Sequence, residues 1–179
     1  RRWLASRFSG RRRRRAVLGS AHARRPGRTG QSSYLILEPS VDQFITYRTR
    51  WADMDPNGHM RHSAYADYAA DQRVVVLASW GYDVAQFARL RLGPILFREE
   101  TKFLKEIHIG EEIRVDGCLA AINANGSRWS IVHTIYKADG RVAATVTVDG
   151  AWLDLDRRKL AVPPAELAGA MADLAPYTV

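Results

Sequence analysis

The chain has 179 residues, 46% of them hydrophobic, which fits one globular domain with a core of its own. No apolar stretch approaches the roughly 20 residues that a membrane-spanning helix needs, so we expect a soluble protein without a membrane span. The single cysteine, Cys118, cannot form an intramolecular disulfide, which fits a reducing, cytoplasmic compartment. We interpret Cys118 as a small buried residue rather than a nucleophile, because no histidine is close to it in sequence.

The net charge of +8 is concentrated near the start of the chain, where residues 1–30 hold eleven of the 27 Lys and Arg residues and no Asp or Glu. The remainder has sixteen basic and nineteen acidic side chains, so its charge gives no reason to expect a nucleic-acid partner. We expect residues 1–40 to form a disordered basic arm, because like charges repel and little apolar surface is there to bury. Its role stays open between an organelle-targeting segment, an arm for nucleic acid or an anionic surface, and an extension without function.

The next segment predicts one strand followed by one long helix. Apolar and polar residues alternate over 44–51, which predicts a strand that includes Trp51. After a loop of turn-forming residues, Ser63 is a candidate N-cap for a helix over 64–80, and Gly81 is a candidate C-cap. The helix is apolar on more than one face, so we expect other structure to surround it.

A run of strands follows a second short helix over 84–90. Four strand-like segments are separated by turn signals, at 94–104, 111–122, 127–138 and 141–154. Asn125-Gly126 and Asp139-Gly140 separate the last three, and these dipeptides favour tight antiparallel hairpins. A strand, a buried helix and an antiparallel meander predict an α+β fold with a sheet of about five strands covering the helix, over residues 41–158.

Two further expectations follow from this arrangement. A single sheet leaves an edge exposed, and pairing with a second copy would cover it, so we expect a homodimer or a dimer of dimers. Residues 159–179 are expected to form a C-terminal tail, in which Pro163-Pro164 start a short helix over 165–174.

The loop before the long helix carries the chemistry-bearing residues. Residues 53–62 read Asp-Met-Asp-Pro-Asn-Gly-His-Met-Arg-His, with two carboxylates, an amide and two imidazoles. A helix start offers unpaired backbone N–H groups and positive dipole charge, which suit an oxyanion forming on a carbonyl. A carboxylate beside it could attack that carbonyl or activate water. The alternative is structural: Asp53 or Asp55 caps the turn, Asn57-Gly58 makes it, and His59 packs on the helix.

These residues resemble the hotdog-fold thioesterases, of both the 4-hydroxybenzoyl-CoA type and the acyl-ACP type. The first group has Asp-x-Asp-Pro-x-Gly before a helix that opens with Asn-Tyr, and here residues 53–58 match that pattern, with Tyr65 matching the tyrosine. The second group has Asp-x-Asn-x-His, matched by Asp55, Asn57 and His59. A looser match follows over 97–104 and 110–113, so that the resemblance covers roughly residues 44–154.

The resemblance implies a helix wrapped by a curved antiparallel sheet, paired subunits with active sites at their interface, and hydrolysis of an acyl thioester. Asp55 would be the nucleophile or general base, and Asn57 and His59 would orient water or the acyl carbonyl. Backbone amides near residues 59–62 would form the oxyanion hole. No metal or cofactor is implied, and the residues expected to contact substrate are Gly58, Met60, Arg61, His62 and Tyr65.

The carrier and the acyl group stay open, although an acyl thioester suggests fatty acid metabolism. Arg61-His62 stands where the acyl-ACP enzymes have Asn-Asn, and Ala64 where the CoA group has Asn, so CoA and acyl-carrier protein both remain. Candidates to meet CoA phosphates are Arg50, Arg61, Arg98, Lys102 and Lys105. Large apolar residues that could limit the depth of the acyl pocket, or simply pack in the core, are Trp80, Phe87, Leu92 and Trp129.

Four other hypotheses are weighed against this one. A hotdog enoyl-thioester hydratase would space its Asp and His by five, whereas His59 lies four after Asp55 and six after Asp53. Another thioesterase branch places its carboxylate on the central helix, where Asp67 and Asp71 are available. A zinc site from Asp55, His59 and His62 lacks an evident fourth ligand. A non-catalytic acyl-thioester-binding module is the hypothesis from a different class.

Overall fold

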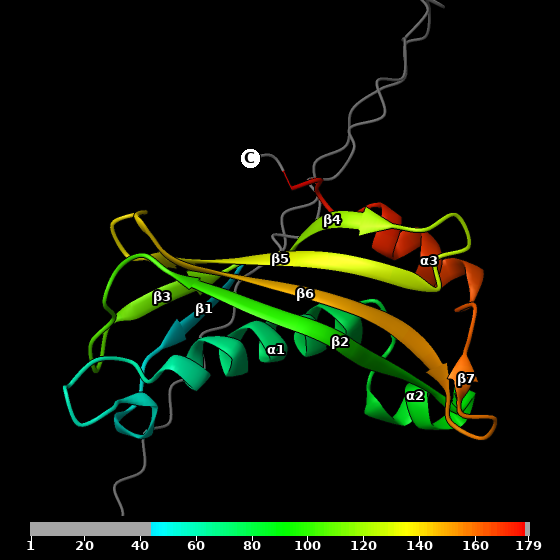
Figure 1. Ribbon diagram of the computed structural model, residues 1–179, viewed down its shortest axis with the longest axis horizontal. Coiled ribbons are helices and arrows are strands. Elements are labelled where there is room, and N and C mark those ends of the chain that lie inside the picture. The colour runs from blue at the N-terminus through cyan, green and yellow to red at the C-terminus, as the bar shows by residue number, and fades with distance from the viewer. Residues whose placement is uncertain (1–43, 178–179) are drawn as a thin grey trace, which may run out of the picture. The chain divides into compact units, whose positions relative to one another are not determined.

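The computed structural model describes residues 44–177, and the arm predicted over 1–40 lies outside them. A curved antiparallel sheet lies along one side of a long helix, α1 (His62–Ser79), as Figure 1 shows. A short helix, α2 (Val84–Leu90), follows α1, and a third, α3 (Ala165–Ala172), lies near the C-terminal end. This α+β arrangement, a helix wrapped by a sheet, confirms the expected hotdog fold.

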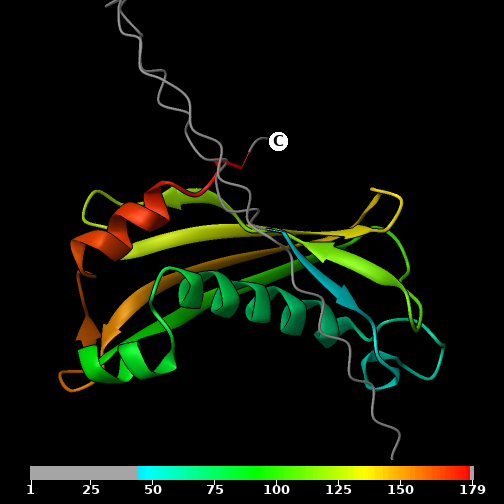
Figure 2. The same cartoon turned by 180° about the vertical axis from the view of Figure 1, so that it is seen from behind.

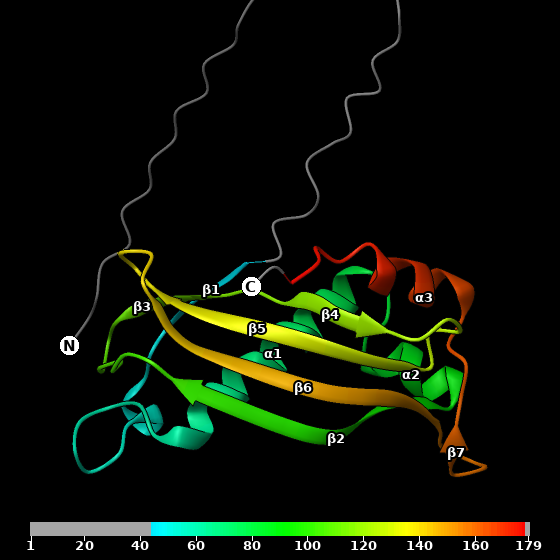
Figure 3. The same cartoon turned by 45° about the horizontal axis from the view of Figure 1, so that its top comes forward.

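The sheet has five strands in the order β1-β3-β5-β6-β2, and two short strands join it at its sides. All pairings between these strands are antiparallel. Strand β2 pairs on one side only, with β6, and therefore forms an edge, which Figure 3 shows. The strands are β1 (Ile45–Arg48), β2 (Leu92–Phe103), β3 (Glu112–Val115), β4 (Cys118–Ile122), β5 (Arg128–Lys137), β6 (Val142–Asp154) and β7 (Lys159–Leu160).

Period-two alternation in the sequence produces the core face of the sheet. Alternate residues of β6 lie beneath α1 and are almost fully buried, with Val146 and Val148 at 0% and Trp152 at 1% exposure. The helix meets this face with small and aromatic side chains, including Ala64 and Tyr65. The tight turns form where expected, since Gly126 and Gly140 have φ of +70° and +82° at the β4–β5 and β5–β6 hairpins.

The sequence predicted one strand over 111–122, but the structure divides this segment into two strands, β3 and β4. The break falls at Asp116-Gly117, where a side chain has no room: a Cβ at Gly117 would lie 2.8 Å from Gln72 Oε1 and 3.2 Å from His133 Cε1. The buried Asp116 carboxylate accepts a hydrogen bond from the Thr134 amide at 2.8 Å, which diverts the chain from regular pairing. Both halves nevertheless pair with β5.

The prediction that Trp51 belongs to the first strand is wrong. Trp51 lies in a short 3-10 turn, Trp51–Asp53, and its side chain is 82% exposed. The strand ends early because the Asp53 carboxylate accepts a hydrogen bond from the Arg50 amide at 2.7 Å.

The long helix also differs from its prediction at both ends: it ends at Ser79, and its C-cap is Trp80 rather than Gly81. It begins at His62, and its N-cap is Arg61 rather than Ser63, whose hydroxyl is occupied by the Arg61 guanidinium. The helix was expected to be surrounded by other structure, but it is covered on one side only. Val74 and Val75 lie on its uncovered side and are 54% and 40% exposed.

The C-terminal segment packs on the domain. Strand β7 pairs with the end of β6, and α3 places Leu167 and Met171 in the core, at 0% and 2% exposure. Figure 2 shows α3 and α1 on the same side of the sheet, near the β4 edge. Within residues 44–177, no helix is both long and apolar enough to cross a membrane.

Candidate active site

The loop before α1 folds back on itself as a small hairpin. Met54 and Met60 form an antiparallel bridge, and the Asp55 amide donates to the His59 carbonyl at 2.8 Å. Gly58 has a φ of +82°, a conformation that favours glycine, and it makes the reversal with Asn57. Asn57 and Gly58 therefore make the turn, as the structural interpretation of this loop expected. The turn fixes the direction in which the loop presents its side chains.

Of the two loop carboxylates, Asp53 has a structural role. Its side chain is 2% exposed and accepts hydrogen bonds from Arg50 Nη2 at 2.9 Å and from the Tyr68 hydroxyl at 2.6 Å. Burial alone would raise the pKa of Asp53, but the hydrogen bonds from Arg50 and Tyr68 hold it at about 2. The carboxylate therefore stays charged and anchors the loop to α1.

Asp55 lies in a different environment, half-buried at the wall of a pocket. Its Oδ1 accepts the backbone N–H groups of Asn57 at 2.8 Å and His59 at 3.3 Å. Its Oδ2 has no hydrogen bond to the residues that the structure describes. One oxygen is thus held by the loop, and the other is left for a ligand or water.

The pocket beside Asp55 has a volume of about 390 Å³. Sequence-predicted residues lining it are Asp55, His59, Met60, His62 and Tyr65. Its opposite wall consists of residues 103–106, from the end of β2 and the turn after it. Asn57, Gly58 and Arg61 do not line it: the first two form the exposed turn, and Arg61 bonds to Ser63 and Asp67.

The start of α1 offers unpaired donors, and of its first two residues His62 lines this pocket. The amides of His62 and Ser63 make no hydrogen bond to other described residues, whereas the Ala64 amide bonds to the Arg61 carbonyl at 2.9 Å. The first turn carries no acidic residue to neutralise the positive end of the helix dipole. These two amides could stabilise an oxyanion.

Tyr65 forms the inner wall, with 4% exposure and an edge-to-face contact to Phe103 at 5.1 Å between ring centroids. Burial, with smaller contributions from Glu106, Glu111 and Asp55, raises the pKa of its hydroxyl. Tyr65 therefore keeps its proton and could donate a hydrogen bond.

Glu106 and His108 are residues of this site that the sequence did not reveal. The Met60 amide donates to the Ile107 carbonyl at 2.7 Å, and His59 pairs with His108 in a bridge, which brings the two loops together. His59 Nε2 lies 3.5 Å from a Glu106 oxygen. No local sequence pattern signals this pairing, because the two loops are separated by the whole of α1, α2 and β2.

The possible metal ligands also differ from the set considered from sequence. Within residues 44–177, the histidine and carboxylate atoms that lie within 4.8 Å of one another belong to His59, Glu106 and His108. Asp55 and His62 are not part of this cluster. Glu106 and His108 are exposed, so the cluster has the residue types for a cation but little enclosure.

Most cations proposed to meet CoA phosphates already have acidic partners. Arg50 pairs with Asp53, Arg61 with Asp67, and Lys102 lies 3.8 Å from Glu100. Arg98 likewise contacts Glu100 and Asp149. Lys105 differs, because no carboxylate of the described residues pairs with it. It borders both the Asp55 pocket and a neighbouring pocket lined by Lys137 and Arg141.

The helix carboxylates lie on another face of α1. Asp67 pairs with Arg61 at 2.9 Å, and Asp71 faces a separate pocket with Tyr47 and Tyr68. Burial, and then the nearby Asp71 carboxylate, raise the pKa of the Tyr47 hydroxyl. Cys118 is only half-buried, rather than buried as expected, and burial raises the pKa of its thiol, which does not favour a thiolate nucleophile.

Comparison with protein families identifies the group to which this fold and loop belong. The model of the Thioesterase-like superfamily matches residues 49–171, more than half of the chain. The protein is a member of the thioesterase-like superfamily. No match was found among curated proteins.

Several solved structures of other proteins share this fold at low sequence identity. A Staphylococcus aureus hypothetical protein, determined in complex with CoA, has a TM-score of 0.71 and 20% identity, covering 76% of this chain and 87% of its own. A 1,4-dihydroxy-2-naphthoyl-CoA thioesterase from Synechocystis has a TM-score of 0.65 and 19% identity, covering 73% and 97%. A gentisyl-coenzyme A thioesterase has a TM-score of 0.62 and 14% identity, covering 69% and 98%.

Proposed function

We propose that this superfamily member hydrolyses acyl-CoA thioesters, with the reaction at the pocket beside Asp55. One observation carries the proposal. Asp55 has one carboxylate oxygen held by loop amides and the other without a protein partner among the described residues, on the wall of a pocket of about 390 Å³ at the start of α1. This combination supplies a base or nucleophile and an anion-stabilising helix end in one place.

The chemistry follows from these two features. Acting as general base, Asp55 takes a proton from water, and the resulting hydroxide attacks the thioester carbon. The tetrahedral oxyanion accepts hydrogen bonds from the amides of His62 and Ser63. Collapse breaks the C–S bond, releasing the acid and a CoA thiolate that takes up a proton. In the nucleophilic variant, Asp55 attacks the carbonyl carbon itself and the C–S bond breaks, which expels the CoA thiolate; water then hydrolyses the resulting mixed anhydride to the free acid and the Asp55 carboxylate.

The other loop residues have supporting roles. Asn57 and His59 hold the Asp55 carboxylate through their backbone amides, and Gly58 permits the turn that places them there. Met60 and Tyr65 form the inner wall, where the Tyr65 hydroxyl can donate to the thioester. The apolar side chains of Phe103 and Leu104 on the opposite wall suit an acyl chain, as in fatty acid metabolism.

We propose CoA rather than acyl-carrier protein as the carrier, because of Lys105. Lys105 lines both the Asp55 pocket and the neighbouring pocket, and it has no carboxylate partner among the described residues. A phosphate there would meet Lys105, whereas the neighbouring Lys137 and Arg141 already pair with Glu111 and Asp139. The structural neighbour determined with CoA is consistent with this carrier.

We also propose a homodimer that pairs through the β2 edge. Strand β2 is unpaired on its outer side and exposes Leu96, Phe97 and Phe103 at 42%, 55% and 54%. Because Phe103 lines the Asp55 pocket, a second copy at this edge would adjoin the site. The molar mass in solution, measured by light scattering, tests this expectation.

Release of free thiol from a panel of acyl-CoAs tests the proposed activity. Asp55→Asn should lower kcat/KM by about 10²- to 10⁴-fold, because a neutral amide can neither accept the water proton nor attack the thioester. Asp67→Asn is the matched control on α1 and should stay within about threefold of wild type. Wild-type protein that binds the acyl-CoAs without releasing thiol would make it a binding module.

The carrier is tested by truncating the substrate rather than the protein. Lys105→Ala should raise KM for acyl-CoA by about fivefold, the loss of one exposed phosphate contact of about 1 kcal/mol. It should leave the acyl-N-acetylcysteamine thioester, which has no phosphate, unchanged. Equal KM changes for both substrates would contradict a phosphate contact at Lys105.

A further inference from the structure

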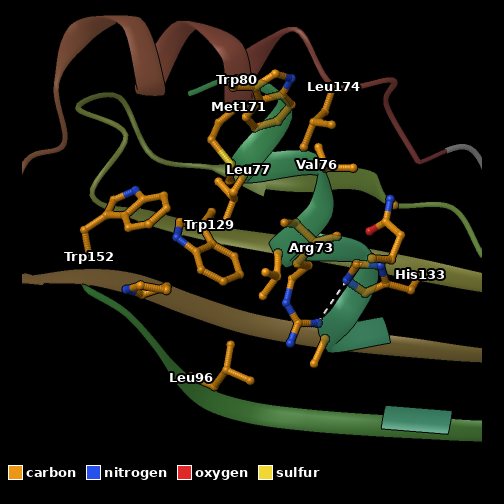
Figure 4. Close-up of a pocket in the computed structure, with 16 residues that line it drawn as sticks. Arg73, Val76, Leu77, Trp80, Leu96, Trp129, His133, Trp152, Met171 and Leu174 are labelled. Atoms are coloured by element: carbon orange, nitrogen blue, oxygen red, sulfur yellow. Dashed lines mark hydrogen bonds between the residues drawn. The ribbon is translucent and has the colours of Figure 1, made fainter. Parts of the chain in front are cut away.

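A second cavity lies along the C-terminal half of α1, between that helix, the sheet and the segment around α3, as Figure 4 shows. Its volume is about 190 Å³, and it shares no lining residue with the Asp55 pocket. Most of the wall is apolar, and three of the five tryptophans in the chain contribute to it: Trp80, Trp129 and Trp152. The cavity is therefore separate from the proposed reaction site.

One cation enters this apolar cavity, the guanidinium group of Arg73. Its Nη1 lies 3.0 Å from His133 Nε2, the contact drawn as a dashed line in Figure 4. On the other side of the ring, His133 Nδ1 lies 2.9 Å from the Asp116 carbonyl oxygen. Because a carbonyl only accepts, the proton is on Nδ1, and Nε2 accepts from Arg73. The imidazole thus orients the guanidinium without neutralising it.

The charge of Arg73 has no counter-ion within contact distance. Burial, and then the Arg73 charge, lower the pKa of His133 to about 3, so the imidazole is neutral at physiological pH. Within residues 44–177, no carboxylate oxygen lies within 4.0 Å of Arg73, and Glu99 acts on it only from farther away. Arg73 is half-buried, and removing a cation from water beside a neutral partner costs free energy unless an anion accompanies it.

Two indole N–H groups at the cavity wall also lack acceptors. Trp129 and Trp152 are 5% and 1% exposed, and their indole N–H groups have no hydrogen-bond partner among the described residues. Buried donors of this kind normally have an acceptor. Arg73 has five N–H donors, of which His133 accepts from one. The unpaired side-chain groups found at this wall are donors, so the cavity is complementary to an acceptor-rich, negatively charged group.

We propose that this cavity binds a small apolar molecule with a single carboxylate, which pairs with Arg73 while its apolar part packs against Trp80 and Trp129. The size fits such a ligand, since a cavity of about 150 Å³ accommodates benzene. A phenyl-sized or short aliphatic acid therefore matches the volume of about 190 Å³. The site lies apart from Asp55, so it binds the acid without catalysing a reaction and does not depend on the proposed thioesterase activity.

Tryptophan fluorescence tests this proposal, because three of the five tryptophans line the cavity. The full-length protein is titrated with phenylacetate and, as a neutral match of similar shape, with 2-phenylethanol. We expect a saturable change with phenylacetate and at least tenfold weaker binding of the alcohol, since the ion pair is lost. Hexanoate should bind like phenylacetate. This comparison uses the wild-type protein, so it does not depend on the folding of a variant.

Substitution at Arg73 locates the binding. Arg73→Gln should weaken phenylacetate at least tenfold and leave the weak binding of 2-phenylethanol unchanged, and Arg73→Lys should lie between. Arg89→Gln, which alters an exposed arginine of α2, is the control and should behave as wild type. Asp55→Asn should bind phenylacetate normally even though it loses thioester hydrolysis. The proposal is overturned if acid and alcohol bind equally, if neither acid gives saturable binding, or if a folded Arg73→Gln binds phenylacetate as tightly as wild type.

Discussion

The two ends of α1 build their polar sites in opposite ways. At its N-terminal end, Asp55 is held by two amides of its own loop, two and four residues away. In the C-terminal half, Arg73 is held by His133, 60 residues away, which in turn is held by Asp116. A locally built site keeps its reactive group near solvent. A site assembled from distant strands can place a half-buried cation in an apolar wall.

The first site can therefore be predicted from sequence, and the second cannot. The turn formers around Asp55 and the helix after them form a continuous pattern, and the structure places His59, Met60, His62 and Tyr65 on the same pocket wall. Whether these residues are catalytic stays a prediction until activity is measured.

The largest stability effect we expect at pH 7 separates the two loop carboxylates. Asp53→Asn should lower the free energy of unfolding by about 2 kcal/mol at pH 7, because the folded pKa of about 2 lies well below the ordinary value of 3.8. Because the pKa of Asp53 is lower in the folded than in the unfolded protein, its carboxylate stabilises the folded state above about pH 4. This contribution to stability is lost as the pH falls toward 2. Urea denaturation at pH 7 and pH 3 measures it.

Asp55→Asn provides the comparison for that experiment. Its carboxylate accepts only two backbone bonds at a half-buried position, so the expected loss is under about 1 kcal/mol. Equal destabilisation by the two substitutions would contradict the division between a structural Asp53 and a pocket-facing Asp55.

A second stability effect, which appears only on acidification, is expected at the other end of α1. The unfolded chain protonates His133 near pH 6.5, whereas the folded protein resists protonation until about pH 3. Wild-type stability should therefore fall on acidification below pH 6.5, by at most about 1.4 kcal/mol per pH unit from this group. His133→Gln removes this slope. Parallel stability curves from pH 7 to pH 4.5 for the two proteins would show that His133 titrates normally.

The smallest expected effect concerns the exposed cluster of His59, Glu106 and His108. The proposed reaction uses Asp55, water and helix amides, so we expect EDTA to leave thiol release unchanged. A loss of activity with EDTA that added Zn²⁺ restores would instead assign the cluster to catalysis.

Features that depend on neighbouring residues along the chain could be predicted from the sequence, whereas features that depend on distant residues could not. Alternation in β6 and the Asn125-Gly126 and Asp139-Gly140 turns fix the meander, since each depends on neighbours along the chain. The break at Gly117 could not be predicted, because its cause is the approach of Gln72 and His133 from other elements. The prediction that Trp51 belongs to the first strand was wrong because the alternating pattern does not show that the Asp53 side chain bonds to the Arg50 amide and ends the strand.

The same limit applies to the candidate site. Glu106 enters it through a bridge between loops, for which the sequence has no local signal. Arg73 has no distinguishing signal in the sequence, because Trp129 and Trp152, which line the same cavity, come from other elements.

A structure of the protein with a non-hydrolysable acyl-CoA thioether measures most directly where the reaction takes place. We expect the carbon corresponding to the thioester carbonyl to lie about 3–4 Å from an Asp55 carboxylate oxygen, next to the amides of His62 and Ser63. Finding that carbon beside Asp67 or Asp71, or in the Arg73 cavity, would contradict it.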